Sequence, residues 1–169
     1  MTTRRILLAV DQSPRADAVA TIAAETARGA HAAVRLLHVA PEPSEVHDRQ
    51  GRVVVYADQE SESLSGEGLD YLRGLEAHFA GVPVESVVRF GEPVARILDE
   101  AEAFGADLIV VGTTGRSAIG RVLLGSVAER VFGRAPVPVM LVRPADQGAR
   151  SAFRSETAAA TSSPPKTRA

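Results

Sequence analysis

Three glycines and a serine form a stretch of this sequence whose spacing indicates ligand chemistry. Two residues separate Gly112 from Gly115, and after nine more intervening residues Gly125 and Ser126 lead into a helical pattern. Glycine lets the main chain turn sharply and bring its N–H groups close to a ligand. The first residues of a helix present unpaired N–H donors at the positive end of the helix dipole, where anions bind. The pattern G-x2-G-x9-G-S therefore predicts a phosphate-binding loop.

Arginine is the cation that this loop has available. The chain contains 18 arginines and one lysine, Lys166, which lies far from the glycine motif. A P-loop lysine or a Schiff-base lysine is thereby excluded at this motif. Arg116 and Arg121 lie within the predicted loop and could supply positive charge to a polyphosphate. The alternatives are that both arginines are solvated, that the glycines only form turns, and that Ser126 is an ordinary helix N-cap.

Two more polar side chains lie at the ends of apolar runs. Asp11 directly follows the run 6–10. Because Ser13 and Pro14 already provide a start signal for the next helix, the Asp11 carboxylate is left to bind a sugar hydroxyl or a base amino group, with helix capping as the alternative. His38 ends the next run without other histidines at metal-ligand spacing, so we expect it to be packed or hydrogen-bonded. No residue is assigned a catalytic or metal-binding role.

Apolar strand-like runs alternate with amphipathic helical segments up to residue 144, which predicts a single doubly wound α/β domain with parallel strands. The runs 6–10 and 108–111 are wholly apolar, as central strands are, whereas Pro138 favours an edge for the last strand. We therefore expect runs 6–10 and 108–111 to be neighbours, with a ligand crevice where Asp11 and Gly112 follow them. The predicted strands are 6–10, 34–39, 84–90, 108–111 and 137–142, and residues 41–58 are predicted to be a long loop. The predicted helices begin at Ser13, Gln59, Pro93 and Ser126. They end before four glycines, each of which is predicted to adopt a left-handed conformation: Gly29, Gly81, Gly105 and Gly133.

The composition limits the partners and the location of the chain. A net charge of −2 and a pI near 6.1 lack the basic excess typical of nucleic-acid binding. The chain has no cysteine, which fits a reducing cytoplasm, and the run 6–10 is too short for a signal peptide or a membrane span. Residues 145–169 are polar and lack apolar periodicity, so we expect a disordered C-terminal tail after a domain of residues 1–144.

Taken together, these motifs resemble the universal stress protein (UspA-like) family over residues 4–143, and in particular its ATP-binding subgroup. The resemblance implies a five-stranded parallel sheet in the order 3-2-1-4-5 with helices on both faces. It also implies bound ATP, with Mg²⁺ as a companion of the phosphates, and a homodimer formed through the last strand, residues 137–142. The stretches that carry the resemblance are 6–11 with Ser13, 36–39, 91–93 with Ile97 and Ala101, 106–112, 115–117, 122–127 and 137–142.

The resemblance also assigns positions around the nucleotide. It implies that four residues lie around adenine and ribose: Ala9, Asp11, Val39 and Val111. It implies that five more residues hold ribose and phosphates: Gly112, Gly115, Gly125, Ser126 and Val127. Arg116 is a further candidate for the phosphates because it lies within the predicted loop.

Three functions from different classes fit these observations. The first is an ATP-binding regulator of a stress response, which acts without catalysis. The second is a weak ATPase or nucleotidyl-transfer enzyme, against which the sequence argues because no Walker lysine, histidine-rich transfer motif or acidic metal pair accompanies the loop. The third is a nucleotide-free dimerisation module in which the glycines serve only as turns.

Overall fold

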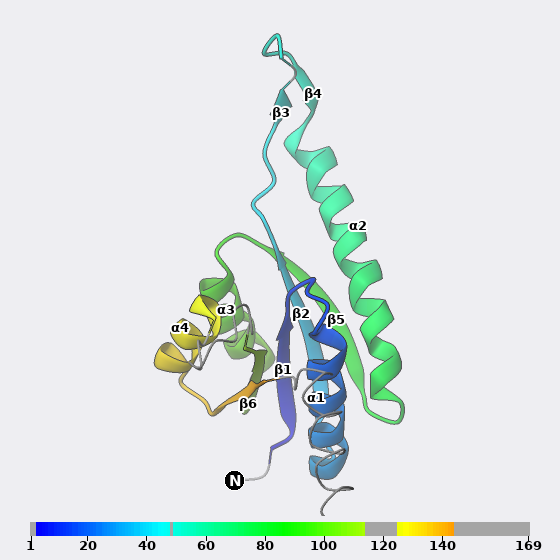
Figure 1. Cartoon of the computed structure of the whole chain (residues 1–169), viewed down its shortest axis with the longest axis vertical. Coiled ribbons are helices and arrows are strands. Elements are labelled where there is room, and N and C mark those ends of the chain that lie inside the picture. Colours follow the sequence, from blue (N-terminus) through cyan, green and yellow to red (C-terminus); the bar gives the residue numbers. More distant parts are fainter. Residues whose placement is uncertain (1–2, 48, 114–124, 144–169) are drawn as a thin grey trace, which may run out of the picture.

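The chain folds around one parallel β-sheet, as a computed structural model shows for residues 3–47, 49–113 and 125–143 (Figure 1). The predicted tail and most of the predicted phosphate loop lie outside these described residues. The elements are β1 (Arg5–Val10), α1 (Ala16–Ala30), β2 (Ala33–Ala40), β3 (Val46–His47), β4 (Val53–Val55), α2 (Ala57–Glu76), the 3-10 helix η1 (Ala77–Phe79), β5 (Val84–Phe90), α3 (Pro93–Phe104), β6 (Leu108–Gly112), α4 (Ser126–Arg134) and β7 (Val139–Val142).

The main sheet has five strands in the order β5-β2-β1-β6-β7, and all neighbouring pairs are parallel. This is the predicted 3-2-1-4-5 order, so the expectation that runs 6–10 and 108–111 are neighbours is confirmed. Ala9 lies opposite Val111 in the register of β1 and β6. The edge position of β7 is also confirmed: Pro138 has no N–H, and its carbonyl accepts a hydrogen bond of 3.0 Å from the Ile109 N–H.

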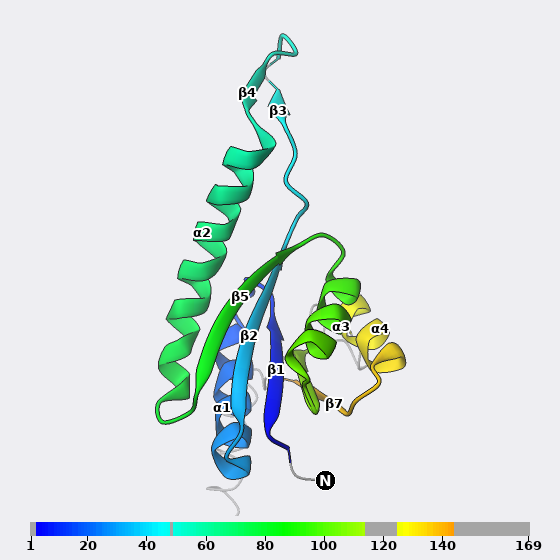
Figure 2. The ribbon, with the colours of Figure 1, turned by 180° about the vertical axis from the view of Figure 1, so that it is seen from behind.

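Helices cover both faces of the sheet, as predicted. Figure 2 shows α3 and α4 on one face and α1 and α2 on the other. The side chains of β1 alternate between these two layers, because successive residues of a strand point to opposite faces. Ile6, Leu8 and Val10 pack in the core under α1 and α2, whereas Leu7 and Ala9 pack in the core under α3 and α4.

The predicted start of the first helix is wrong. Ser13 is not its N-cap, because α1 begins at Ala16 with Arg15 at the cap position and no side-chain cap hydrogen bond. The Ser13 carbonyl instead accepts a hydrogen bond of 3.1 Å from the Ala16 N–H. This main-chain turn lengthens the connection between β1 and α1, so a local start signal at Ser13 and Pro14 is overridden.

Two of the four predicted helix-ending glycines are confirmed. Gly81 and Gly105 have φ values of 78° and 64°, in the left-handed region that favours glycine. Gly29 and Gly133 instead lie inside α1 and α4. Helix α1 continues to Ala30, and its C-cap His31 takes the left-handed position with φ 52°; histidine tolerates this region better than most residues do.

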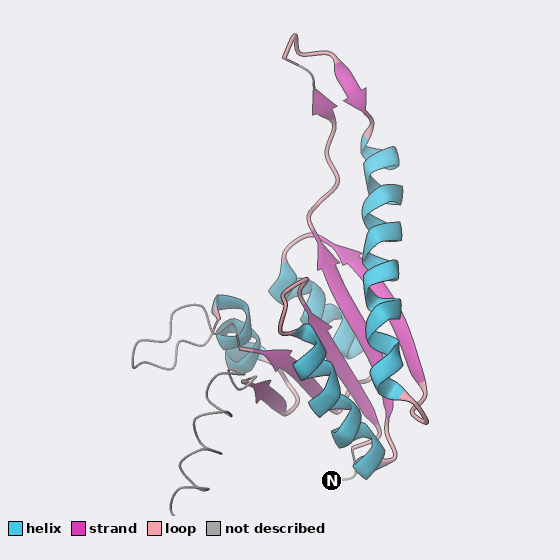
Figure 3. Ribbon diagram, turned by 45° about the vertical axis from the view of Figure 1, so that its right-hand side comes forward, coloured by secondary structure: helices cyan, strands magenta, loops and turns pink. Residues whose placement is uncertain are grey.

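Residues 41–58 are not only the long loop that the sequence predicts. They contain β3 and β4, which pair as an antiparallel hairpin, and α2 already begins at Ala57. The hairpin and the first turns of α2 project beyond the main sheet (Figure 3). The sequence signal was the short run of three valines in β4 after Gly51, whose φ of 76° fits a tight turn. Among the described helices, none has the length and apolar character needed to cross a membrane.

Candidate functional site

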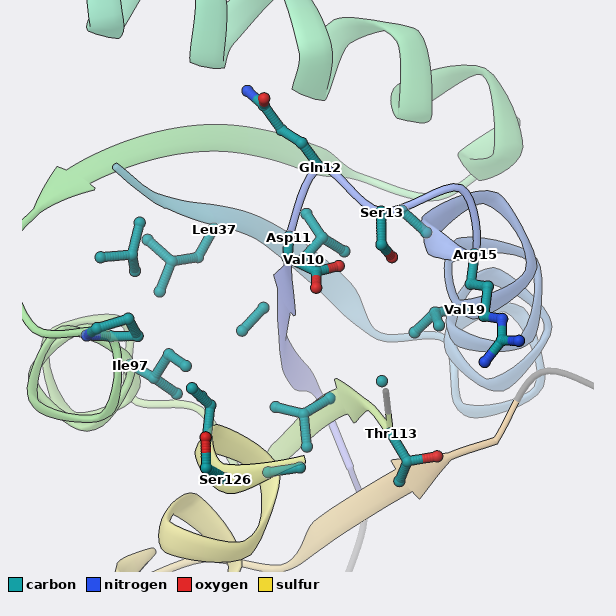
Figure 4. A pocket seen from close by; sticks show the side chains of 18 of the residues that line it. Val10, Asp11, Gln12, Ser13, Arg15, Val19, Leu37, Ile97, Thr113 and Ser126 are labelled. Carbon is teal, nitrogen blue, oxygen red and sulfur yellow. The ribbon is translucent and has the colours of Figure 1, made fainter. Parts of the chain in front are cut away.

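A cavity of about 740 Å³ lies at the carboxyl ends of β1 and β6, where the sequence predicts the crevice (Figure 4). It is lined by the ends of β1, β2 and β6, the turn 11–15, and the first residues of α1, α3 and α4. The volume falls within the roughly 300–1,000 Å³ typical of small-molecule sites. The ends of adjacent parallel strands whose crossovers lead to opposite faces are the usual place for a ligand in this architecture.

Most of the predicted binding residues surround this cavity. Gly125 precedes the lining residue Ser126 as the N-cap of α4. Gly115, Arg116 and Arg121 lie outside the described residues. Seven of the ten predicted residues line the cavity: Ala9, Asp11, Val39, Val111, Gly112, Ser126 and Val127.

One wall of the cavity is apolar. It is formed by residues from β1, β2, β6, α3 and α4 that belong to the core under α3 and α4. Leu37 and Val111 are buried there, while Ala9 and Val39 are only partly buried and keep surface toward the cavity. An apolar wall of this kind suits the face of an aromatic ring.

The N-terminus of α4 forms a second, polar wall. Helix α4 has nine residues and starts at Ser126, which lines the cavity with Val127 and Ala128. Its N-cap is Gly125, which has no side chain that could cap the first turn. The N–H groups of that turn and the positive end of the helix dipole therefore favour an anion at this side of the cavity.

Asp11 connects the cavity with a neighbouring helix. Its exposed carboxylate lines the cavity (Figure 4), and its main-chain carbonyl accepts a hydrogen bond of 2.5 Å from the Tyr71 hydroxyl of α2. The pKa of Tyr71 is raised to about 12, mainly because the hydroxyl is partly buried and also because the carboxylates of Asp11 and Asp17 lie nearby. Since α1 has no side-chain cap, the alternative role of Asp11 as its cap is wrong.

The prediction that the glycine at the end of β6 serves a sharp turn is wrong, because the structure gives it a packing role. Gly112 and Gly125 both lack a positive φ, so neither needs glycine for a sharp turn. A Cβ atom at Gly112 would lie 3.1 Å from Cγ2 of Val19 in α1. Gly112 therefore allows β6 to pack closely against α1 at the edge of the cavity.

Several lining residues were missed by sequence reasoning. Thr113 is buried, and its N–H and hydroxyl both donate to the Val142 carbonyl, at 2.8 and 3.3 Å, which ties the end of β6 to β7. Pro93 and Ile97 of α3 and Val19 of α1 also line the cavity. Their signal was their place at a helix start or on a buried helical face, which by itself indicates only a core position.

Within residues 3–47, 49–113 and 125–143, no group of three or more histidine and carboxylate side chains could hold a metal ion. His38 is hydrogen-bonded, as predicted: its Nδ1 lies 3.2 Å from the Val10 carbonyl, and its ring packs edge-on against Tyr71 with 5.7 Å between centroids.

Comparisons of the chain with known sequences point to one family. The universal stress protein family matches residues 2–143. A universal stress protein from Thermus aquaticus is 38% identical over 141 residues, which cover 83% of this chain and 98% of the relative. Universal stress protein MJ0531 from Methanocaldococcus jannaschii is 44% identical over 85 residues, which cover 49% of this chain and only 50% of that protein.

Solved structures agree with the sequence comparisons. Universal stress protein UspA from Lactobacillus plantarum has a TM-score of 0.67 at 27% identity, and the match covers 85% of this chain and 99% of that chain. The universal stress protein from Archaeoglobus fulgidus in complex with dAMP has a TM-score of 0.54 at 27% identity, with 83% and 98% coverage. Sequence and structure together show that this chain belongs to the universal stress protein family.

Proposed function

We propose that the chain binds an adenine nucleotide, with ATP as the preferred ligand, in the cavity at the ends of β1 and β6 and acts as a nucleotide-dependent regulator. The observation that carries the proposal is the combination of an apolar wall, the Asp11 carboxylate and the N-terminus of α4 around one cavity of about 740 Å³. The dAMP complex of the related Archaeoglobus fulgidus protein supports the same ligand class.

Each part of the nucleotide matches a part of this cavity. Adenine would stack against the apolar wall that includes Ala9, Val39 and Val111. The Asp11 carboxylate, an acceptor at this position, would accept a hydrogen bond from a sugar hydroxyl. The phosphates would bind the first-turn N–H groups of α4, together with Gly115 and Arg116 from the loop before it. Mg²⁺ would enter with the phosphates, whose charge it neutralises.

A regulatory role follows from what a ligand at this place would stabilise. A nucleotide that contacts β1, α3 and α4 at once favours the conformation in which these elements close around it, and it stabilises that conformation by mass action. We propose that such closure changes the surface to which a partner protein or a second copy of the chain binds. The proposed homodimer contact is the edge strand β7. A reducing cytoplasm is the proposed location.

Equilibrium titration calorimetry with ATP, ADP, cyclic AMP and 2′-deoxy-ATP, each with and without Mg²⁺, tests the proposal. We expect ATP to bind, and we expect Asp11→Ala to weaken it about tenfold or more, because a hydrogen bond to a charged group contributes roughly 1.5–3 kcal/mol. Asp70→Ala, an exposed carboxylate on α2, is the matched control and leaves the affinity unchanged. No affinity of the wild-type chain for any adenine nucleotide at millimolar concentration would overturn the proposal.

Two further measurements separate this function from its alternatives. Native mass spectrometry detects a co-purifying adenine nucleotide, which a nucleotide-free dimerisation module would lack. A phosphate-release assay with the wild type and Asp11→Ala tests for ATP hydrolysis. Turnover that disappears in the variant while folding is retained would favour an enzyme over a regulator.

A further inference from the structure

Side chains from α2 and β2 hold the segment that carries Asp11. The Tyr71 hydroxyl of α2 donates to the Asp11 carbonyl at 2.5 Å, and Nδ1 of His38 in β2 lies 3.2 Å from the Val10 carbonyl. Since a carbonyl can only accept, the second contact requires a proton on Nδ1. The carbonyls of Val10, at the end of β1, and of Asp11, the first residue of the turn, are therefore each held by a side chain from a different element.

The two side chains also support each other. Their rings pack edge-on with centroids 5.7 Å apart and planes at 69°, an arrangement that restricts the orientation of both. Burial and the carboxylates of Asp11 and Asp17 keep the Tyr71 hydroxyl protonated well above neutral pH, so it remains a donor to the carbonyl. His38 and Val10 are partners in the register of β2 and β1.

Helix α2 lies close to the sheet where this contact forms. Gly68, one turn before Tyr71, is buried, and a Cβ atom there would lie 2.8 Å from Cγ2 of Val88 and 3.3 Å from Cδ2 of His38. Residues three apart on a helix share a face, so this close approach brings Tyr71 within reach of the end of β1. Figure 4 shows α2 passing beside the turn that carries Asp11.

Asp11 thus has two sides. Its carboxylate lines the cavity, and its carbonyl is bonded to α2. Because the main-chain orientation at Asp11 sets the direction of its side chain, holding the carbonyl also orients the carboxylate. Resting on the nucleotide site proposed above, we infer that Tyr71, supported by His38, is a positioning residue that aims the Asp11 carboxylate at the bound nucleotide.

A double-mutant cycle on ATP affinity tests this role. Tyr71→Phe removes only the hydroxyl, and we expect it to weaken ATP about fivefold, the change that corresponds to one typical hydrogen bond. In an Asp11→Ala background the same change is expected to alter the affinity less than about twofold, because the carboxylate that it orients is gone. Tyr56→Phe is the matched control: the other tyrosine of the chain is exposed and lies roughly 22 Å away along α2 at 1.5 Å per residue.

The outcomes of the cycle separate the two proposals. Equal losses of affinity in both backgrounds would mean that Tyr71 only supports the fold, and an unchanged affinity would mean that it does not position the site; either result overturns the inference while ATP binding stands. If the wild-type chain binds no adenine nucleotide, the proposed function and the inference both fall. Because Asp11 is exposed, water can bind the freed carbonyl, so we expect the Tyr71→Phe chain to fold.

A spectroscopic measurement tests the same contact without a variant of Tyr71. The chain has two tyrosines, so 3-fluorotyrosine labelling gives two ¹⁹F signals, which Tyr56→Phe assigns. We expect saturating ATP to shift the Tyr71 signal and to leave the Tyr56 signal in place. A Tyr71 signal that does not move when ATP saturates the protein would overturn the inference.

Discussion

The close approach of β6 to α1 leads to a sharp prediction about the first glycine of the motif. Gly112→Ala would place a methyl group 3.1 Å from Cγ2 of Val19, whereas carbon atoms in contact prefer about 3.5–4.0 Å. Val19 is buried and β-branched, so it cannot move aside by changing rotamer freely. One of the two elements must therefore shift by several tenths of an ångström.

The magnitude follows from two opposing effects. Overpacking costs about 1–3 kcal/mol, and replacing glycine by alanine in a conformation open to alanine restores about 0.4–1 kcal/mol through the unfolded state. We expect Gly112→Ala to lower the free energy of unfolding by about 1 kcal/mol. Val19→Ala alone deletes two buried methyl groups and costs about 2 kcal/mol. In the double variant the new methyl fills part of the vacated space, so we expect the double loss to be about 1 kcal/mol smaller than the sum of the single losses.

Urea unfolding followed by far-UV circular dichroism measures the free energy of unfolding of the two single variants and of the double variant. An unchanged m-value indicates that a variant changes stability alone. Gly133→Ala is the control, because a Cβ atom there has nothing within 4 Å and the residue lies inside α4. It is expected to be neutral or stabilising, since alanine is the better helix former by about 1 kcal/mol. Additivity of the two losses within about 0.5 kcal/mol would refute the close-packing role of Gly112.

Two further predictions concern α3, which carries part of the cavity wall. The buried Glu100 carboxylate pairs with Arg35 at 2.5 Å and with Arg89 at 2.7 Å. We expect Glu100→Gln to lower the free energy of unfolding in urea by about 3 kcal/mol, the lower end of the range for a broken buried pair because Arg89 is half-exposed. Glu102 is exposed, so Glu102→Gln is expected to leave that free energy nearly unchanged. Glu92 caps α3, and main-chain N–H donors of its first turn lower the pKa of its carboxyl. Because the pKa of Glu92 is lower in the folded than in the unfolded chain, its ionised carboxylate stabilises the fold above the unfolded-state pKa, and this stabilisation is lost as the pH falls through the folded-state pKa. Glu92→Gln should therefore lower the free energy of unfolding at neutral pH and match the wild type in strong acid.

Local apolar patterns were enough to predict the sheet. The runs at β1 and β6 are buried on both faces, and their unbroken apolar sequence reflects that environment directly. Because parallel strands in such a sheet all end at one edge, the meeting of Asp11 and Gly112 at a cavity also followed from the sequence. The family resemblance supplied the full strand order, which the structure confirms.

Helix ends and the segment 41–58 were predicted less well, because weak local signals compete there. Ser13 and Pro14 form a good start signal, but a main-chain turn to Ala16 delays α1. Gly29 has the right spacing for a helix end, yet the helix continues to Ala30 and His31 is its C-cap. Three valines in β4 are too short a run to predict a strand without the partner with which they pair.

Some features of the predicted site are local in the sequence, and others depend on contacts between distant elements. Asp11 and Ser126 could be predicted from residues next to them in the chain, because a strand end and a helix start are local features. The hydrogen bond between Tyr71 and Asp11 joins residues 60 positions apart, and the contact that requires Gly112 comes from Val19 in another element. Such contacts depend on the distance between packed helices and the sheet, which side chains from several elements set together. Which residues end at the cavity is therefore encoded locally, and how they are held there is decided by tertiary packing.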